Sequence, residues 1–469
     1  MKLDLAVKQI LAKLNRAGFE VAVVGGAVRD LLVGSGVVDW DLTTNANPQE
    51  ILKLFPRGFY NNRFGTVGVP ISEDKIVEIT TYRKEVGYTD RRHPDKVVWG
   101  KTLDEDLGRR DFTINAMALR LRSGQAIQSK KQLGISNFQL VDPYDGQKDF
   151  KNKIIRAVGD PDRRFGEDAL RILRAARFAT TLGFKIENKT KAAIQKNAPL
   201  LPKISGERIR DELFKIIDSL HAAEGILLLK EAKILAVVLP ELEECFRVEQ
   251  KSPKRHHIYD VGTHCVMSLK FCPSNETVVR LATLLHDVGK SKVAAVTEEG
   301  VRTFYNHEVV GGRMAVTIAK RLHLPREQRE KLFKLVRWHQ FSVNEAQTDR
   351  ALRRFIRNIG PENIEAMMDL RVGDRLGGGL QQPESWRLKL FRKRLKEVLT
   401  KPFTVADLKV NGHDVMEILK IKPGPKVGEV LKTLFEEVAD DPEKNKREYL
   451  LLRIGELLPN NKKRRSVEN

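Results

Sequence analysis

Two aspartates stand two residues apart in a short strand-like segment of the sequence. Asp39 and Asp41 flank a tryptophan, and alternate residues of a strand project from the same face. Carboxylates placed in this way can hold a hard cation such as Mg²⁺ and leave coordination positions for a phosphate. Glu78, in a second strand-like run, is the expected third carboxylate. The pattern predicts metal-dependent chemistry on a phosphate, with an ordinary surface pair as the alternative.

A glycine turn lies upstream of these carboxylates. The apolar run at 21–24 ends in Gly25 and Gly26 and leads into a helix that carries Arg29. Glycines let backbone N–H groups approach a phosphate closely, and a helix N-terminus favours an anion. We therefore expect this turn and Arg29 to contact a triphosphate. A tight turn with Arg29 in a surface ion pair is the alternative that the residues leave open.

A second set of chemically competent residues lies in the third quarter of the chain, where most of the histidines gather. His264, His286 with Asp287, and later Asp374 have helical surroundings. Imidazole and carboxylate ligands together suit Zn²⁺, Mn²⁺, Ni²⁺ or Fe²⁺, and such ions can activate water against a phosphoester. The sequence thus contains a second candidate metal site, far from the first along the chain.

The elements that must position these residues differ between the two sites. Up to about residue 150, short apolar runs alternate with helical stretches, which indicates a mixed α/β unit. We expect strands over 21–26, 39–44, 64–71 and 75–82, the last two as a hairpin, followed by a polar loop over 83–96. From about Asp160 onward the pattern is helical, with no convincing strand.

Composition limits the classes of protein that fit. The chain has 469 residues, enough for about three domains, and 83 basic against 62 acidic residues give a net charge of +21. This excess favours a polyanionic partner such as nucleic acid, although a merely basic protein is the alternative. No apolar run is long enough for a membrane span, and none of the three cysteines forms a Cys-x-x-Cys pair. The N-terminal segment reads as an amphipathic helix rather than a signal peptide, so we expect a reducing, cytoplasmic setting.

Five motifs occur in the order found in class II tRNA nucleotidyltransferases. This family includes the CCA-adding enzymes and the bacterial poly(A) polymerases, within the polymerase-β-like superfamily. The motifs that carry the resemblance lie at residues 25–30 with 39–41, 109–116, 142–146, 167–178 and 204–209.

The resemblance implies an α+β protein: a polymerase-β-like nucleotidyltransferase head with a small mixed sheet, then an all-helical neck, an HD body and a tail. The implied units are a catalytic head (1–150), a neck that binds the nucleotide base and RNA (151–245), an HD domain (246–380) and a tRNA-binding tail (381–469). Two Mg²⁺ ions on Asp39 and Asp41 would promote attack of an RNA 3′-OH on the α-phosphate of a nucleoside triphosphate. Arg110 is the implied nucleotide contact of the second motif. No obligate protein partner is evident.

Base selection is expected from a carboxylate and a guanidinium on a helix over 166–178. Asp168 and Arg171 would be neighbours on one face. The Asp168 carboxylate would accept a hydrogen bond and the Arg171 guanidinium would donate one. This pair complements the Watson–Crick edges of cytosine and adenine but not those of uracil and guanine. Arg174, 120° around an ideal helix from Asp168, could still reach the nucleotide. Arg177, at about 180°, could do so only if the helix were distorted or the ligand wrapped around it. A surface Asp168–Arg171 ion pair is the alternative.

The motifs also bear on which member of the family the chain resembles. Complete CCA-adding enzymes are similar in carrying a charged loop, here residues 83–95. In the segment 62–68, the neutral Gly-Thr-Val form at 65–67 resembles the CCA branch rather than the more basic poly(A) polymerases. We therefore expect addition of C, C and A to tRNA from CTP and ATP. Poly(A) synthesis and CC-only or A-only addition remain alternatives. Segments 411–416 and 421–428 resemble the tail of bacterial CCA-adding enzymes, with a plain helix–loop–helix as the alternative.

The run Leu284–Lys290 resembles the HD phosphohydrolase signature. The resemblance makes His264, His286, Asp287 and Asp374 the ligands of a divalent transition metal. His307 and His339 are placed where binuclear members have ligands to a second metal. Two alternatives stay open, a live phosphohydrolase acting on damaged tRNA ends and a helical scaffold that holds tRNA. A rival of another class is an HD hydrolase whose head only binds RNA.

Overall fold

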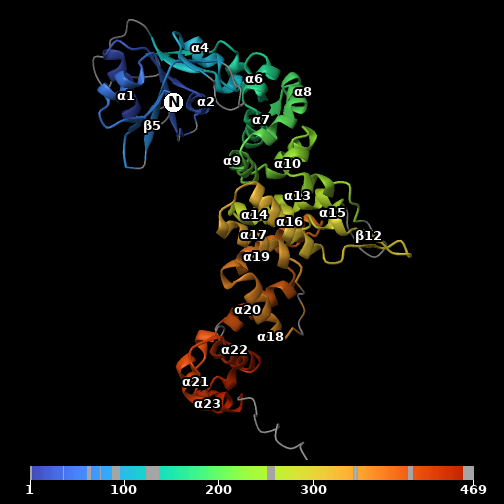
Figure 1. The fold of residues 1–469 in the computed structure, drawn as a ribbon. Helices are drawn as coiled ribbons and strands as arrows, with labels where there is room; N and C mark the ends of the chain where they lie inside the picture. Colours follow the sequence, from blue (N-terminus) through green and yellow to red (C-terminus); the bar gives the residue numbers. More distant parts are fainter. Residues whose placement is uncertain are drawn as a thin grey trace, which may run out of the picture.

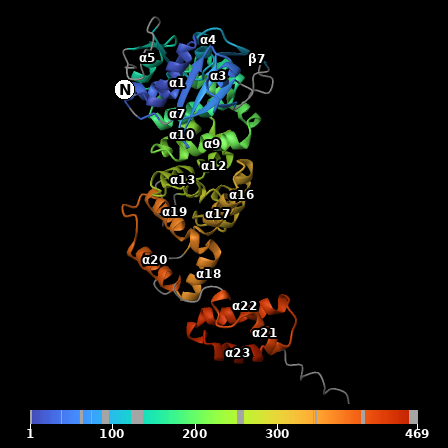
Figure 2. The same ribbon diagram turned by 90° about the vertical axis from the view of Figure 1, so that its left-hand side faces the viewer.

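The chain forms a row of units with the N-terminal head at one end and the C-terminal tail at the other (Figures 1 and 2). The computed structural model describes residues 3–34, 36–37, 39–60, 65–73, 75–86, 96–122, 137–250, 259–341, 344, 347–399 and 405–457. Within these ranges, no helix combines the length and the apolar character that a membrane span requires.

The head is built on a seven-stranded sheet with the order β3-β4-β5-β2-β1-β8-β9. β2 and β5 are parallel, whereas the other neighbours are antiparallel, so the sheet is mixed. This confirms the expected fold class, and β4 and β5 form the expected antiparallel pair. The strands are β1 Val21–Val24, β2 Trp40–Thr44, β3 Phe59–Tyr60, β4 Thr66–Pro70, β5 Ile76–Thr81, β8 Ala118–Leu121 and β9 Phe138–Val141.

The central strand β1 is apolar at every position because both of its faces are covered. On one face, Val21 and Val23 join a core with apolar residues of α1 (Leu5–Arg16) and α2 (Gly26–Val33). On the other face, Ala22 and Val24 pack with Tyr82 and with Leu103 and Leu107 of α4 (Leu103–Gly108). α3 (Pro48–Leu54) begins with a capping box at Asn47. Helices on both faces thus hold the centre of the sheet in place.

Part of the segment expected as a polar loop is a strand. β6 (Arg83–Val86) pairs antiparallel with β7 (Lys96–Trp99). Backbone pairing overrides the polar composition of this stretch, since β-propensity depends strongly on context. Residues 87–95 of the expected loop, and 62–64 of the segment compared with the CCA branch, lie outside the described residues.

Helices dominate the rest of the chain, as expected, but two pairs of two-residue strands correct the prediction that no strand follows Asp160. β10 (Ile154–Ile155) pairs with β11 (Lys185–Ile186), and β12 (Ala295–Val296) pairs with β13 (Arg302–Thr303). Pairs this short carry too little alternation to be recognised in a sequence. The β12–β13 pair projects from the body (Figure 1).

The neck and the body share one apolar core, which extends from Phe112 to Val398. The neck helices are α5 Gly146–Lys151, α6 Pro161–Glu167, α7 Leu170–Leu182, α8 Asn188–Asn197, α9 Gly206–Ile217, α10 Ala222–Glu231, α11 Leu235–Val238 and α12 Pro240–Cys245. The body helices are α13 Val261–Lys270, α14 Thr277–Leu285, α15 Lys290–Val293, α16 His307–Arg321, α17 Arg326–Trp338, α18 Asp349–Ile359 and α19 Ile364–Gly377. α20 (Trp386–Leu399), which lies in the segment expected as the tail, packs into the same core.

The tail has a separate small core around Val415, Leu434 and Leu450. Its helices are α21 (Gly412–Leu419), α22 (Pro425–Asp440) and α23 (Arg447–Glu456). Asn411 caps α21 in a capping box, and proline occupies the first turn of α22. The two tail segments singled out in the sequence therefore form a helix–loop–helix.

Candidate active sites

The head carboxylates meet in the middle of the sheet. Asp41 on β2 is paired in register with Glu78 on the parallel strand β5 and with Val24 on β1. Asp39 directly precedes β2 and is exposed, as is Glu78, whereas Asp41 is partly buried. Parallel partners present side chains on the same face. The fold thus brings Asp41 and Glu78 side by side, and they lie 37 positions apart in the sequence.

The electrostatics of Asp41 suit a cation. Burial raises its pKa, the Arg110 guanidinium lowers it, and the neighbouring Glu78 and Asp39 carboxylates raise it further, so that the net shift is upward. Neighbouring carboxylates repel each other when both are ionised. A divalent cation bound between them neutralises this charge and stabilises the ionised forms. The donor set therefore fits a hard metal ion such as Mg²⁺.

The glycine turn lies against the same carboxylate. Gly25 has φ +73°, and a Cβ at this position would lie 2.9 Å from Arg110 Nη1 and 3.3 Å from Asp41 Oδ2. Only glycine allows both this backbone conformation and this approach. α2 begins at the next residue, Gly26. The predicted strand-to-helix turn, Asp41 and Arg110 are thus brought together.

A chain of hydrogen bonds links α2 of the head to the neck. Arg29 Nη1 donates to Asn115 Oδ1 at 3.1 Å, and Asn115 Nδ2 donates to Asp111 Oδ1 at 3.2 Å. Arg174 Nε, on α7, donates to Asp111 Oδ2 at 2.8 Å. Arg29 also pairs with Asp30 at 2.8 Å, so the ion pair considered as an alternative is present. Burial raises the pKa of Asp111, but Arg174 and further hydrogen bonds lower it to about 2.

The expected helix over 166–178 is broken, which corrects the placement of the base-selecting pair. α6 ends at Glu167, Asp168 has extended backbone angles (φ −139°, ψ 106°), and α7 begins at Leu170. Asp168 Oδ1 accepts the Leu170 N–H at 3.0 Å, and its Oδ2 accepts from Arg208 Nη2 at 3.1 Å. An aspartate side chain that bonds the backbone two residues on competes with helix formation. Asp168 and Arg171 therefore do not share a helix face.

Arg171 is held by other partners. Its Nη1 donates to Glu167 Oε2 at 2.7 Å, and its Nη2 donates to the Arg109 carbonyl at 3.2 Å. Asp168 pairs instead with Arg208, a residue of the fifth motif. Thus the simple Asp168–Arg171 ion pair does not form, but both residues lie at the α6–α7 turn and Arg171 contacts the Arg109–Arg110 segment.

Arg174 and Arg177 share one environment. The Arg177 guanidinium lies 3.8 Å and that of Arg174 5.4 Å from the centre of the Phe178 ring. Arg177 also bonds Glu212 of α9. The angles expected for Arg174 and Arg177 assumed an unbroken helix that includes Asp168, so those angles do not apply. Glu212 and Asp111 orient these arginines, a role that the sequence motifs did not predict for either residue.

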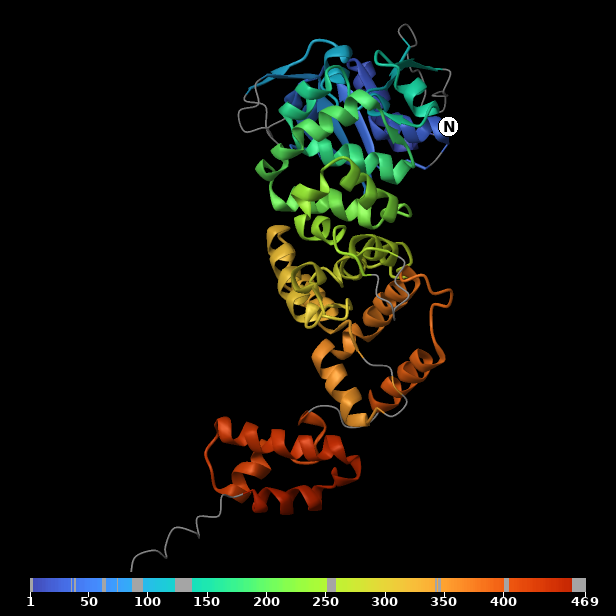
Figure 3. The ribbon, with the colours of Figure 1, turned by 90° about the vertical axis from the view of Figure 1, so that its right-hand side faces the viewer.

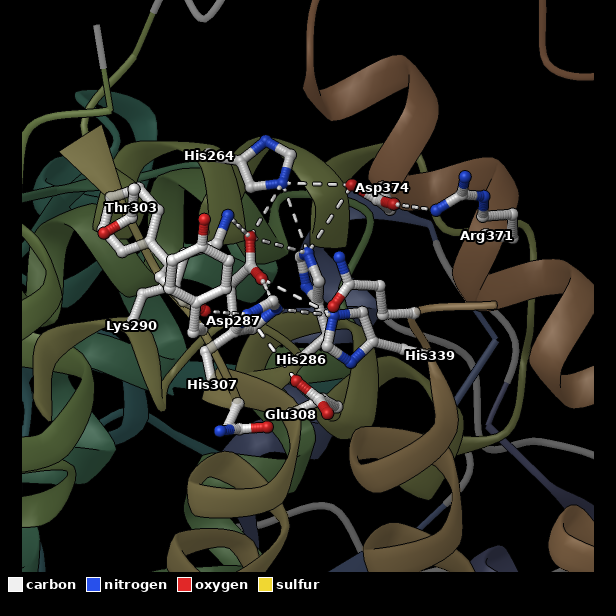
Figure 4. Close-up of a pocket in the computed structure, with 14 residues that line it drawn as sticks. His264, His286, Asp287, Lys290, Thr303, His307, Glu308, His339, Arg371 and Asp374 are labelled. Carbon is white, nitrogen blue, oxygen red and sulfur yellow. Dashed lines mark hydrogen bonds and ion pairs between the residues drawn. The ribbon is translucent and has the colours of Figure 1, made fainter. Parts of the chain in front are cut away.

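The body holds a second cluster, in which six side chains form two groups of three with ligand atoms within 4.8 Å of one another. The groups are His264, His286 and Asp374, and Asp287, His307 and His339. Asp287 lies between them (Figure 4). Its Oδ2 is 3.5 Å from His264 Nε2 and 3.3 Å from His286 Nε2. Its Oδ1 is 3.3 Å from His307 Nε2 and 3.5 Å from His339 Nε2.

Backbone carbonyls orient three of the histidines. The Nδ1 atoms of His286, His307 and His339 each lie 2.8 Å from a main-chain oxygen three residues earlier. A carbonyl that accepts from Nδ1 leaves Nε2 as the free ligand atom. Burial lowers the pKa of His286, but Asp287 and Asp374 raise it to about 10. The negative charge of these carboxylates fits divalent cations, which the two groups of three side chains would hold.

The cluster lines a pocket of about 470 Å³. Lys290 Nζ lies 2.6 Å from Asp287 Oδ2, and Arg371 Nη1 lies 3.0 Å from Asp374 Oδ2. Tyr305, 78% exposed, also lines this pocket. Arg371 was not anticipated from the sequence; its spacing of three residues from Asp374 on a helix is the signal that could have indicated it. The pocket can accept an anion beside the candidate metal ligands.

Four family descriptions match successive parts of the chain. They are the Poly A polymerase head domain (21–156), "Probable RNA and SrmB- binding site of polymerase A" (183–246), the HD domain (255–376) and tRNA nucleotidyltransferase domain 2 (380–454). The fold and the matched domains define a nucleotidyltransferase with a polymerase head and an HD body.

Whole-chain comparisons specify the family. The CCA-adding enzyme of Lactococcus lactis subsp. lactis is 31% identical over 454 residues, which are 96% of this chain and 97% of that protein. The crystal structure of the Bacillus stearothermophilus CCA-adding enzyme in complex with CTP is 27% identical, with a TM-score of 0.68 and 96% of each chain covered. The chain belongs to the CCA-adding enzyme family.

A further relative matches over a shorter region. The CCA-adding enzyme of Lactobacillus helveticus is 48% identical over 217 residues, 46% of this chain and 50% of that protein. The match with this relative thus spans about half of its length.

Proposed function

We propose that this chain adds C, C and A to the 3′ ends of tRNA, with CTP and ATP as donors and without a nucleic-acid template. The observation that carries the proposal is the meeting of Asp41, Glu78, the Gly25 turn and Arg110 at one place in the head. Two of the CCA-adding enzymes named above match nearly the whole chain, and one of these is solved with CTP.

In this proposal, Asp39 and Asp41 hold divalent metal, taken to be Mg²⁺, with Glu78 as the third carboxylate. When bound, such ions activate a hydroxyl nucleophile and stabilise charge on a leaving pyrophosphate. The Gly25–Gly26 turn offers backbone N–H groups to the triphosphate at the start of α2. Arg29 and Arg110 supply positive charge beside it. These groups orient the α-phosphate for attack by the tRNA 3′-OH.

The base reader in this proposal is the α6–α7 turn. Asp168 accepts from the exocyclic amino group and Arg171 donates to the ring nitrogen, a pattern that cytosine and adenine satisfy and uracil and guanine do not. Since Asp168 is paired with Arg208 and Arg171 with Glu167, binding of the base exchanges these partners. Arg174 and Arg177, stacked near Phe178, contribute positive charge for the nucleotide.

An incorporation assay tests the proposal. A tRNA that ends at its discriminator base is incubated with each labelled triphosphate and Mg²⁺. Incorporation of C, C and then A is the expected result. A homopolymer of A would instead indicate poly(A) synthesis, and incorporation that stops after two C residues or accepts only A would indicate a partial enzyme. Phosphate release without incorporation would favour the hydrolase with an RNA-binding head.

The units of the chain receive roles in the same proposal. The head (1–150) carries the transfer chemistry, the neck (151–245) reads the base and contacts RNA, and the tail (381–469) binds tRNA. The basic charge of the chain, +21, favours binding of a polyanion along its length.

A second activity is supported by the body. Two three-ligand groups bridged by Asp287 suit divalent transition metals, which activate water against a phosphoester when bound. We propose that this site removes a 2′-phosphate or opens a 2′,3′-cyclic phosphate at a damaged RNA end. Phosphate release and metal content, measured on wild type and on His264→Ala, test it. Equal metal content in both proteins would contradict the assignment of His264 as a ligand.

A further inference from the structure

One buried carboxylate of the head lies between the two parts of the proposed nucleotide site. Asp106 belongs to α4, on the side of the head where the neck begins (Figures 1 and 3), and it is completely buried. Leu103 and Leu107 of the same helix pack against the sheet, so the adjoining Asp106 also lies in the interior. At the end of α4, the Gly108 carbonyl accepts from Arg164 Nη2 of α6 at 2.8 Å. A buried carboxylate raises the free energy of the folded protein unless cations pair with it.

The spacing of the sequence supplies those cations. Arg109 and Arg110 follow Asp106 by three and four positions, which brings them to the same side of a helical turn. Arg109 Nε and Nη2 donate to Asp106 Oδ1 at 2.9 and 2.7 Å, and Arg110 Nη2 lies 3.5 Å from Oδ2. Burial raises the pKa of Asp106, but Arg109 and Arg110 lower it by more, so the net shift is downward. The carboxylate is therefore ionised and faces one arginine with each oxygen.

Each arginine contacts a different part of the proposed nucleotide site. Arg110 lies beside Gly25 and lowers the pKa of Asp41, where the metal and the triphosphate are proposed to bind. The Arg109 carbonyl accepts from Arg171 Nη2 at 3.2 Å, and Arg171 belongs to the proposed base reader. The two oxygens of one carboxylate thus hold the segment that connects the triphosphate part of the site to the base part.

The contact between Asp106 and Arg110 is looser than the contact between Asp106 and Arg109. Among the described residues, Asp106 Oδ2 accepts no hydrogen bond and Arg110 Nε, which is also buried, donates none. Arg110 Nη1 donates a long hydrogen bond to the Asn115 carbonyl at 3.5 Å. Buried polar atoms without partners raise the free energy of the folded protein. Charge rather than short hydrogen bonds therefore holds the Arg110 guanidinium, which retains hydrogen-bonding capacity for a phosphate oxygen.

We propose that Asp106 is a positioning residue that fixes Arg110, at the triphosphate, relative to Arg171, at the base. The inference rests on the proposed function, because it takes CTP and ATP as the ligands. Asp106 contacts neither ligand and acts through Arg109 and Arg110. A base that bonds correctly to Arg171 is then presented with its triphosphate at Asp41, whereas a base that displaces Arg171 loses this alignment.

The variant Asp106→Asn tests the proposal, since the amide keeps the shape and removes the charge. In incorporation into tRNA, we expect KM for CTP to rise roughly tenfold and the ratio of kcat/KM for CTP to that for UTP to fall roughly tenfold. This ratio does not depend on the fraction of folded protein, so a purely structural role for Asp106 would leave it unchanged. Asp349→Asn removes an aspartate that pairs with Arg394 at 3.1 Å, remote from the head. It is the matched control and leaves KM and the ratio at their wild-type values.

Arg109→Lys is a second variant, which carries the test if Asp106→Asn does not fold. Lysine keeps the charge but lacks the fork of donors with which a guanidinium holds a carboxylate oxygen. Oδ1 of Asp106 then loses its anchor on the side of the base reader, while Oδ2 still faces Arg110. We expect the ratio of CTP to UTP to fall and KM for CTP to change little. An unchanged ratio in Arg109→Lys, or in folded Asp106→Asn, would overturn the proposal.

A double variant shows whether Asp106 acts through Arg110. In an Arg110→Ala background, we expect Asp106→Asn to raise KM for CTP no further, because the side chain that it positions is gone. A further rise as large as in the wild-type background would contradict the proposal. Equilibrium dialysis with CTP and UTP separates this inference from the proposed function. If the wild type added no nucleotide but bound CTP more tightly than UTP, and Asp106→Asn lost this preference, the proposed function would fail while the inference stood.

Discussion

Asp41 is both partly buried in the sheet and close to other carboxylates. It occupies a central strand, so burial raises its pKa, and it faces two further carboxylates that raise it again. Without a cation, burial of the ionised carboxylate beside two others raises the free energy of the folded protein. A bound cation offsets this cost. The neighbouring Arg110 compensates in part.

Replacement of Asp41 tests this role. In Asp41→Asn the amide preserves shape but removes the charge that holds the metal, and we expect addition to fall by roughly 10³-fold or more. Single-turnover incorporation of CMP into tRNA measures the loss. Phosphate release by the body, measured in the same protein, serves as the control and should persist. Addition close to the wild-type rate would contradict the metal-binding role.

Asp111 predicts a pH dependence of stability. Its folded pKa of about 2 lies below the ordinary value of 3.8, so its contribution to the free energy of unfolding is present above pH 3.8 and is lost as the pH falls toward 2. Lowering the pKa from 3.8 to about 2 corresponds to about 2 kcal/mol. Urea unfolding of wild type and Asp111→Asn should give a stability gap that is constant from about pH 5 to 7 and narrows below about pH 4. A gap that does not change with pH would contradict this assignment.

At the scale of elements, the turn between β1 and α2 positions the head site. Its backbone is left-handed at Gly25, and the space beside it is filled by Arg110 and Asp41. The α6–α7 turn is similar in kind: Asp168 ends one helix and caps the next, while its second oxygen bonds Arg208. Both turns place functional groups where a regular element could not.

A matched pair of glycine variants separates strain from steric effects at the first turn. Gly25→Ala places a side chain on a backbone with φ 73° and ψ −141°, which costs about 1–3 kcal/mol, and it also displaces Arg110. We therefore expect both lower stability and a raised KM for CTP. Gly34→Ala, at φ +74° with nothing within 4 Å of its Cβ, incurs only the backbone cost. Unfolding curves and addition kinetics distinguish the two. A wild-type KM in Gly25→Ala would show that the close approach is unimportant.

The contact between α9 and the end of α16 predicts a further effect. A Cβ on Gly206 would lie 2.2 Å from the Arg321 carbonyl, so Gly206→Ala forces the neck and the body apart. We expect a loss of about 1–3 kcal/mol in the free energy of unfolding. Gly428→Ala, where a Cβ meets nothing within 4 Å, is the helical control. Equal stability of the two variants would contradict tight packing at this junction.

At the scale of the whole molecule, two candidate sites of different chemistry share one chain. The head site consists of carboxylates with arginines, and the body site of histidines with bridging Asp287. The neck connects them through a continuous apolar core, and α16 runs from His307 in the body cluster to Arg321 at the neck. The tail has its own core.

Independence of the two sites is a prediction at this scale. Asp374→Ala removes a ligand of the body cluster only, so we expect loss of bound transition metal and of phosphate release, with addition of C, C and A unchanged. Metal analysis and the incorporation assay measure the two properties in one preparation. Loss of both activities, in this variant or in Asp41→Asn, would contradict the two-site arrangement.

The sequence by itself determined the kinds of group and their order along the chain. The Asp39–Asp41 pair, the glycine turn, the HD signature and the five motifs are local patterns of residue type and spacing, so a sequence displays them directly. That the head combines strands with helices, and that the remainder is mainly helical, also followed from local periodicity.

Only the tertiary structure decided which groups meet. Asp41 faces Glu78 because β2 and β5 pair in one register, and Asp287 stands between two ligand groups because separate helices converge on it. Asp168 leaves the helix because its side chain finds the Leu170 amide and Arg208, a contact 40 residues away. The pocket lined by residues of α18 and α22 exists only because the two helices lie opposite each other. Such contacts join residues distant in sequence, and local pattern carries no information about them.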